Sequence, residues 1–153
     1  MWLAQQGHEV TGLDLSDVGI GQAKALAEEA GVTVDFRAID LARTWQPEPD
    51  SYDLIILSYL QLPPDTRRAA HANAARALAP GGTLFLIAHH ADNLEHGVGG
   101  PPYPEVLFDE DELAEDFGEL DIGRNEKVLR DVVGDDGVTR QAHDVMLVAS
   151  KAS

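Results

Sequence analysis

Apolar residues in this sequence switch repeatedly between two spacings, and this switching restricts the possible folds more than any other feature. Short continuous or alternating apolar runs are typical of strands, whereas apolar residues three and four positions apart are typical of amphipathic helices. A chain in which strands and helices alternate usually builds a parallel sheet, because each helix returns the chain to the start of the next strand. The sequence therefore predicts a doubly wound α/β fold.

The first 88 residues predict four strands and the helices that connect them. Residues 1–6 resemble the end of a helix that Gly7 terminates, and Ser16 or Asp17 is placed to cap the next helix. Strands are expected at residues 9–14, 32–38, 53–58 and 83–88, and the main helices at residues 18–30 and 64–78. The continuous apolar run at 53–58 predicts a central strand covered on both faces, and the alternating run at 32–38 predicts a strand near a sheet edge.

The last third of the chain has a different pattern. Residues 89–108 form a long loop rich in glycine and proline, which is typical of lids, and Asp109 is expected to cap a short acidic helix. Runs at 122–133 and 138–149 flank the turn residues 134–137 and predict an antiparallel hairpin. We expect a mixed sheet within a single domain of residues 1–153.

Composition excludes several classes of function. Eleven Lys and Arg residues against 27 Asp and Glu residues give a net charge of −16, which disfavours nucleic acid and anionic membranes as partners. The absence of cysteine excludes disulfides, thiolate zinc sites and a cysteine nucleophile. No apolar run is long enough for a membrane span and no secretory signal is visible, so we expect a cytoplasmic location.

Candidate site residues stand where the predicted strands end, because open α/β sheets bind ligands beyond the carboxyl ends of their strands. Asp14 is one such residue, and a carboxylate there can accept hydrogen bonds from both hydroxyls of a ribose. Alternatively, Asp14 or its neighbours only cap the following helix. Asp40 ends the adjacent strand and could bind the exocyclic amine of adenine.

Four segments together resemble the successive motifs of class I S-adenosylmethionine-dependent methyltransferases. They are Glu-Val-Thr-Gly-Leu-Asp-Leu-Ser at 9–16, Ala-Ile-Asp-Leu at 38–41, Tyr-Asp-Leu-Ile-Ile-Leu-Ser at 52–58 and Leu-Ala-Pro-Gly-Gly-Thr-Leu at 78–84. The chain is similar in particular to small bacterial methyltransferases related to tellurite-resistance proteins. That likeness extends through Gly99-Gly-Pro-Pro102 and the final hairpin.

This resemblance implies a Rossmann-like fold, S-adenosylmethionine as cofactor, and in-line methyl transfer to a small molecule. It assigns the ribose hydroxyls to Asp14, an apolar face of adenine to Leu15, and the adenine edge to Asp40 and Leu41. Ser58 and Tyr59 would line the methyl-transfer pocket.

The family pattern also begins with a strand and a glycine-rich loop that have no counterpart before Met1. We therefore expect the first central strand to be missing and two apolar strand edges to be unpaired, with Met1 internal to a longer reading frame. Two chains could cover this gap in a homodimer.

Two other interpretations stay open at this point. Gly19 and Gly21, with Asp40 further on, suggest a dinucleotide-binding oxidoreductase domain, although Lys24 stands where the third glycine belongs. A non-catalytic or truncated methyltransferase-like binding domain is the second. A metal site at the histidines is not predicted, because neighbouring residues on a strand face opposite ways. One of His89 or His90 could nevertheless face the pocket and deprotonate a nucleophile.

Overall fold

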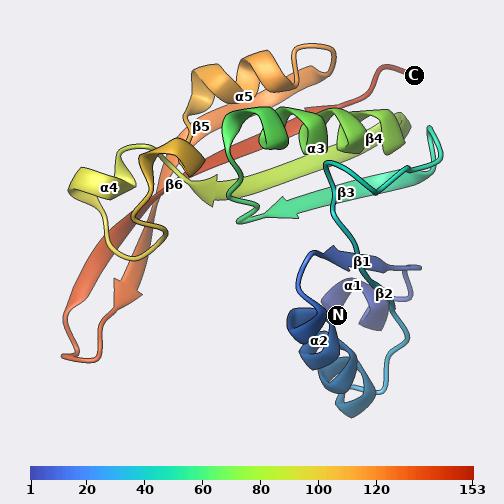
Figure 1. Ribbon diagram of the computed structural model, residues 1–153, viewed down its shortest axis with the longest axis horizontal. Coiled ribbons are helices and arrows are strands. Elements are labelled where there is room, and N and C mark those ends of the chain that lie inside the picture. The colour runs from blue at the N-terminus through green and yellow to red at the C-terminus, as the bar shows by residue number, and fades with distance from the viewer. The chain divides into compact units, whose positions relative to one another are not determined.

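The computed structural model describes residues 1–153, which form two compact units (Figure 1). The N-terminal unit contains Met1–Trp45 and the C-terminal unit contains Gln46–Ser153. Strands and helices alternate over residues 1–38 and over residues 52–89, as the apolar pattern predicts.

The N-terminal unit consists of two parallel strands joined by a helix. Its elements are α1 (Trp2–Gln5), β1 (Thr11–Asp14), α2 (Asp17–Glu29) and β2 (Asp35–Ala38). Asp14 pairs with Ala38 in the register of β1 and β2. The predicted cap of α2 is confirmed, since the side chain of Ser16 accepts a hydrogen bond from Gly19 N at 3.0 Å.

Both strands of this unit are shorter than predicted. Val32 N still donates to Ala27 O at 3.0 Å, so this residue completes the end of α2 instead of beginning a strand. Within the pair, a Cβ added to Gly12 would lie 2.6 Å from the ring of its partner Phe36. The ring of Phe36 therefore occupies the position that a side chain on residue 12 would take, and only glycine fits there.

The C-terminal unit is a four-stranded mixed sheet with helices α3 and α5 on one face (Figure 1). The strand order is β3-β4-β6-β5, where β3 and β4 are parallel and β6 is antiparallel to both its neighbours. This confirms the mixed sheet and the final hairpin. The elements are β3 (Tyr52–Ser58), α3 (Pro64–Ala77), β4 (Leu78–His89), α4 (Asn93–His96), η1 (Pro104–Val106), α5 (Glu110–Asp116), β5 (Asp121–Val133) and β6 (Thr139–Ser150).

The core of this unit lies between the two central strands and the helices. Alternate residues of β4 and β6 are buried, and α3 buries alanines whose small side chains allow a close approach of the helix to the sheet. The main members are Leu84, Leu86, Ala88, Val145, Leu147 and Ala149 from the strands, and Ala70, Ala74, Ala77, Leu113 and Phe117 from the helices. Each fully buried leucine contributes about 1.5–3 kcal/mol to folding.

The predicted central position of β3 is wrong for this sheet, because β3 is an edge strand with β4 as its single neighbour. Ile55 and Leu57 are buried, whereas Leu54 and Ile56 on the other face are 42% and 48% exposed. The helices of this unit cover one face of the sheet, so a continuous apolar run does not guarantee burial on both. β1 also has a single neighbour, β2, so one edge of each strand is unpaired, as expected.

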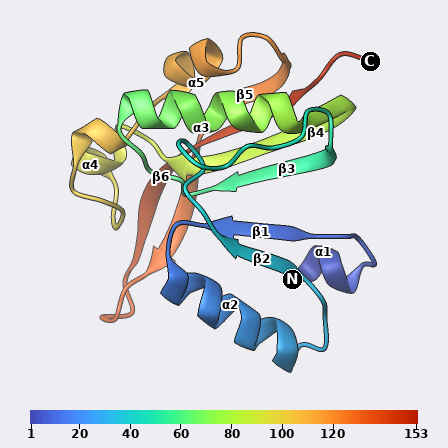
Figure 2. The same cartoon turned by 45° about the vertical axis from the view of Figure 1, so that its right-hand side comes forward.

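The β5–β6 hairpin extends past the end of β4 (Figures 1 and 2). Residues 139–142 of β6 pair with β5 alone, and the turn includes Gly137 at φ 74°. No helix of the chain combines the length and apolar character that crossing a membrane requires.

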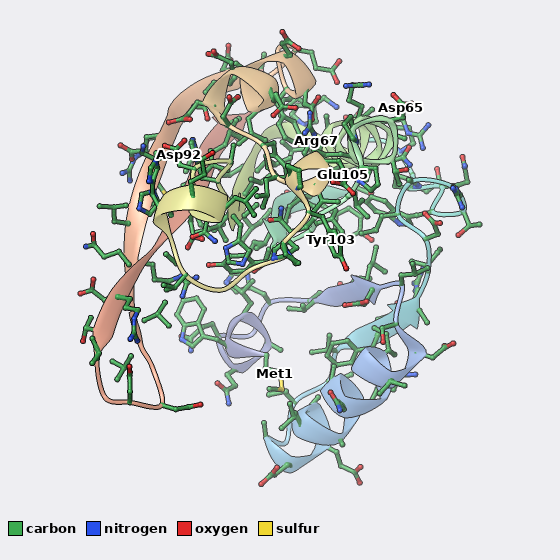
Figure 3. All side chains as sticks on the ribbon, turned by 60° about the vertical axis from the view of Figure 1, so that its left-hand side comes forward. Met1, Asp65, Arg67, Asp92, Tyr103 and Glu105 are labelled. Carbon is green, nitrogen blue, oxygen red and sulfur yellow. The ribbon has the colours of Figure 1, made fainter.

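The connection between β4 and α5 is fastened to β6 at one buried side chain. Asn93 donates from Nδ2 to Gly99 O at 2.8 Å and accepts from His143 N at 2.8 Å through Oδ1. Figure 3 labels Asp92 near the start of this connection and Glu105 near its end. The predicted loop therefore contains short helical turns, and Asn93 ties its first part to the hairpin.

Candidate functional site

Asp14 ends β1 with one carboxylate oxygen engaged and the other available. Its Oδ1 accepts a hydrogen bond from Ser16 N at 2.8 Å, which holds the turn into α2. The capping of α2 itself belongs to Ser16. Oδ2 of Asp14 accepts no hydrogen bond within the chain, and the side chain is exposed together with Leu15.

Asp40 follows β2 and lies at the same edge of the two-stranded sheet, since β1 and β2 run parallel. Ile39 N donates to Asp14 O at 2.7 Å, so the backbone hydrogen bonding between the two segments continues up to the residue before Asp40. Oδ1 of Asp40 accepts from Ala42 N at 2.9 Å and from Arg43 N at 3.0 Å. Like Asp14, Asp40 shapes its turn with one oxygen, and the half-buried Leu41 lies beside it.

In the C-terminal unit, β3 ends in the exposed Ser58, and Tyr59 follows in the left-handed region at φ 51°. Non-glycine residues rarely adopt this conformation, and such strain is frequent at functional sites. Two hydrogen bonds hold Tyr59 there. Its N–H donates to Ile87 O at 2.7 Å, and its hydroxyl donates to Oδ2 of Asp144 at 2.9 Å.

Asp144 is a fully buried carboxylate on β6 that joins three side chains. Its Oδ2 also accepts from Nε of Arg130 at 2.8 Å, and its Oδ1 lies 3.2 Å from Nδ1 of His89. Burial and the hydrogen bond to Asp144 raise the pKa of Tyr59, and the hydrogen bond to the carboxylate raises the pKa of Arg130. We call Tyr59, His89, Arg130 and Asp144 the Asp144 cluster.

His89 is the last residue of β4, and its surroundings fix both its backbone and its ring. The side chain of Gln61 accepts from His89 N at 2.8 Å and donates to Val106 O at 2.6 Å. The His89 ring lies 4.9 Å from that of Tyr59, measured between centroids. A Cβ added to Gly100 would lie 2.9–3.0 Å from the His89 ring, so only glycine leaves space on that side.

His90 belongs to a different set of contacts. Its Nε2 lies 2.9 Å from Oε2 of Glu110, and its Nδ1 accepts from Asp92 N at 2.9 Å. Glu110 in turn accepts from Lys127 N at 2.8 Å, which links α5 to β5. Of the two neighbouring histidines, His89 is thus the one that lies in the Asp144 cluster.

Sequence reasoning missed Asp144 and Arg130. Asp144 interrupts the mostly apolar segment 142–149, where an isolated carboxylate on a buried strand is costly unless it has partners. That interruption is a signal for a functional or structural polar cluster. Arg130 offers no such signal, because charged residues are common on exposed hairpin strands.

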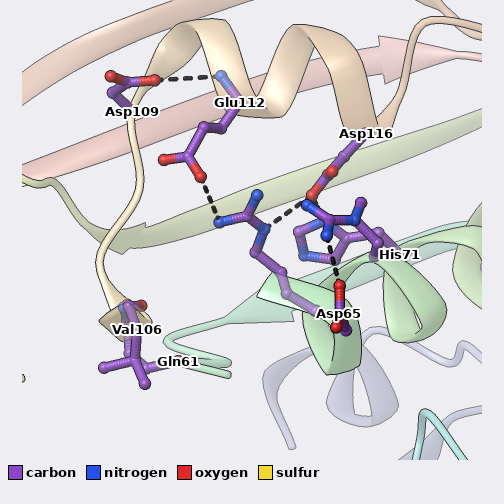
Figure 4. A network of polar contacts seen from close by, with 9 residues as sticks. Gln61, Asp65, His71, Val106, Asp109, Glu112 and Asp116 are labelled. Carbon is purple, nitrogen blue, oxygen red and sulfur yellow. Dashed lines mark hydrogen bonds and ion pairs between the residues drawn. The ribbon is translucent and has the colours of Figure 1, made fainter. Parts of the chain in front are cut away.

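A second polar cluster lies between α3 and α5 (Figure 4). Asp116 accepts from Nε of Arg67 at 2.8 Å and lies 2.7 Å from Nδ1 of His71, while Glu112 accepts from Nη1 of Arg67 at 3.0 Å. We call these four residues the Arg67 cluster. None of them stands at a strand end.

Comparison with known proteins identifies the family. The family model described as "Methyltransferase domain" matches residues 1–82, which is more than half of the chain. The chain belongs to the methyltransferase domain family. The match includes β1, β2, β3 and α3, so both Asp14 and Tyr59 lie within the methyltransferase domain segment.

A curated relative of this methyltransferase domain is the ubiquinone biosynthesis O-methyltransferase of Idiomarina loihiensis, which is 33% identical over 85 residues. The aligned region covers 55% of this chain and 35% of that protein, so the chain matches about a third of the relative's length.

Solved structures share the fold. TehB from Haemophilus influenzae superposes with a TM-score of 0.78 at 17% identity, over 98% of this chain and 52% of TehB. The N-methyltransferase NodS from Bradyrhizobium japonicum, in complex with S-adenosyl-L-homocysteine, superposes with a TM-score of 0.71 at 18% identity, over 95% of this chain and 67% of NodS. The Rossmann-like α/β fold expected from the sequence is therefore confirmed.

Proposed function

We propose that this protein is an S-adenosylmethionine-dependent methyltransferase that acts on a small molecule. The observation that carries the proposal is the position of Asp14 and Asp40, at the carboxyl ends of two paired parallel strands in a chain of the methyltransferase domain family. Ligands of open α/β sheets bind at such strand ends. Two acidic residues there suit the hydroxyl and amine groups of an adenosine.

The residues present fit this cofactor. The uncommitted Oδ2 of Asp14 can accept hydrogen bonds from the ribose hydroxyls, and the exposed Leu15 offers an apolar surface to adenine. Asp40 and Leu41 would bind the edge of the base, and Ser58 and Tyr59 would line the pocket for the methyl acceptor. When bound, S-adenosylmethionine supplies an electrophilic methyl group, and the acceleration comes largely from positioning the acceptor in line with it.

A small-molecule acceptor is supported by the curated relative, which is an O-methyltransferase of ubiquinone biosynthesis. The net charge of −16 disfavours nucleic acid as a substrate. A cytoplasmic location and a homodimer remain predictions.

We also propose that both units belong to one domain. The family match over residues 1–82 crosses the boundary between them at Trp45.

Calorimetric titration of S-adenosylhomocysteine into the 153-residue chain tests the proposed cofactor site. Saturable binding is expected, and Asp14→Ala should weaken it about ten- to a hundredfold, because hydrogen bonds to a charged group contribute about 1.5–3 kcal/mol. Asp17→Ala, an exposed aspartate in the first turn of α2, is the matched control and should bind like the parent chain. A folded chain that binds nothing, or equal affinity in the Asp14→Ala variant, contradicts the proposal.

A further inference from the structure

The Asp144 cluster contains two buried polar atoms that face each other and have no other partner. They are Nδ1 of His89 and Oδ1 of Asp144, which lie 3.2 Å apart with the ring N–H not aligned for a regular hydrogen bond. The other carboxylate oxygen, Oδ2, is already engaged by Tyr59 and Arg130. Hydrogen bonds of catalytic groups are often long or poorly aligned before the substrate binds. His89 Nδ1 is therefore the group available to Oδ1.

This arrangement favours one of the two ring nitrogens of His89 as the one that holds the proton. A carboxylate accepts hydrogen bonds, so a neutral His89 ring would place its proton on Nδ1 and leave a lone pair on Nε2. Nε2 makes no hydrogen bond within the chain. Unlike Nδ1, it is not fully buried. The bare backbone of Gly100 lies beside it, where a Cβ would come within 3.0 Å. The Gly100 side of the ring is therefore closed, and an acceptor group would reach Nε2 from its solvent-exposed side.

We propose that Nε2 of His89 accepts the proton of a hydroxyl group on the methyl acceptor, and that Asp144 positions the His89 ring for this role. The inference rests on the proposed methyltransferase function and specifies its substrate class. Phenolic hydroxyls ionise near pH 10 and need a base at neutral pH, whereas thiols ionise near pH 8.5 and need one much less. An oriented imidazole base therefore favours an oxygen acceptor.

The proton and electrons balance in a single step. The acceptor oxygen forms its bond to the methyl carbon as the carbon–sulfur bond breaks, and the electron pair of the broken bond stays on sulfur. The hydroxyl proton passes to Nε2 of His89, which becomes an imidazolium. The Asp144 carboxylate stabilises this cation through Nδ1–H, and the proton then passes to water.

Nitrogen-15 NMR of the histidine-labelled full chain tests the pair without any cofactor. At neutral pH, His89 should have its proton on Nδ1, and Asp144→Ala should shift the proton toward Nε2. His89→Gln identifies the His89 signals, and His96→Gln, which changes an exposed histidine, should leave them unmoved. A parent chain whose His89 has its proton on Nε2 overturns the proposal.

Methyl transfer to two probes tests the substrate class. With catechol as acceptor, His89→Gln should lower kcat about 10²- to 10⁴-fold, while transfer to thiophenol and the affinity for S-adenosylhomocysteine change little. Equal catechol rates in the variant and the parent, or transfer to thiophenol alone, overturn the assignment. Failure to bind S-adenosylhomocysteine would instead contradict the proposed function, and the NMR measurement judges the His89–Asp144 pair independently.

Discussion

The C-terminal unit contains two nearly inaccessible carboxylates, Asp116 and Asp144, that contact the same kinds of partner in different surroundings. Each accepts a hydrogen bond from an arginine and lies next to a histidine. Asp116 is enclosed, because the side chains of Arg67 and His71 are 1% and 0% exposed. The side chain of Arg130, the partner of Asp144, is 44% exposed.

Aromatic rings complete the enclosure of the Arg67 cluster. The ring of Phe117 stacks on His71 with centroids 4.7 Å apart, and the guanidinium of Arg67 lies 4.9 Å from the centroid of Phe108. In the Asp144 cluster, Tyr59 and Arg130 connect the buried carboxylate to the surface. We expect an enclosed charge cluster to stabilise helix packing, and a cluster with solvent-exposed members to be able to exchange protons with a ligand.

The largest expected effect is the loss of stability in Asp116→Ala. Removing Asp116 leaves the Arg67 charge buried, with the partly exposed Glu112 as its remaining ionic partner, and breaking such a pair costs about 3–5 kcal/mol. Urea unfolding of the full chain measures the change. Glu112→Ala is the control and should cost about 1 kcal/mol or less. A loss in Asp116→Ala no larger than in this control would show that the cluster is not essential for helix packing.

The corresponding change in the other cluster, Asp144→Ala, should cost about 1–3 kcal/mol, typical for loss of a hydrogen-bonded buried acceptor. The smaller loss is expected because Arg130 and Tyr59 can turn to water when the carboxylate is removed. The same urea unfolding measures it. Asp131→Ala, an exposed aspartate on the same hairpin, is the control. A loss equal to that of Asp116→Ala would remove the distinction between the two clusters.

Local signals predicted most of the fold. Ser16 caps α2, Asp109 caps α5 by accepting from Glu112 N at 3.1 Å, and Gly137 allows the hairpin turn, because each of these effects depends on a few neighbouring residues. The position of β3 could not be predicted in this way. Burial of Leu54 depends on what covers the second face of the sheet, and the residues of the strand do not specify that.

Some residues of the candidate site could likewise be predicted from local sequence, and others could not. Asp14, Asp40 and Tyr59 stand at or within two residues of strand ends, so their positions follow from the order of elements. Asp144 meets Tyr59 across 85 positions of sequence, and Asp116 meets His71 across 45. Such pairs depend on strand order and helix packing, which no local pattern encodes.

The smallest expected effect is a difference in acid sensitivity between the parent chain and His71→Gln. Burial, together with the Arg67 charge, lowers the pKa of His71 despite the opposing effect of Asp116, so below about pH 6.5 the unfolded chain binds a proton that the folded chain does not. This histidine therefore makes stability fall as pH decreases from about 6.5, by at most about 1.4 kcal/mol per pH unit. Burial alone would raise the pKa of Asp116, but hydrogen bonds from His71 and Arg67 hold it below its ordinary value, so the Asp116 contribution is lost only below about pH 4.

Glutamine at position 71 keeps a neutral donor for Asp116 and removes the titration. Urea unfolding at pH values from 5 to 8 should thus give a flatter profile for His71→Gln, whereas His96→Gln, which changes an exposed histidine, should follow the parent chain. Parallel profiles for His71→Gln and the parent would mean that His71 takes up a proton as easily in the folded as in the unfolded chain. The Arg67 cluster would then be as open to proton exchange as the Asp144 cluster, and enclosure would no longer separate the two.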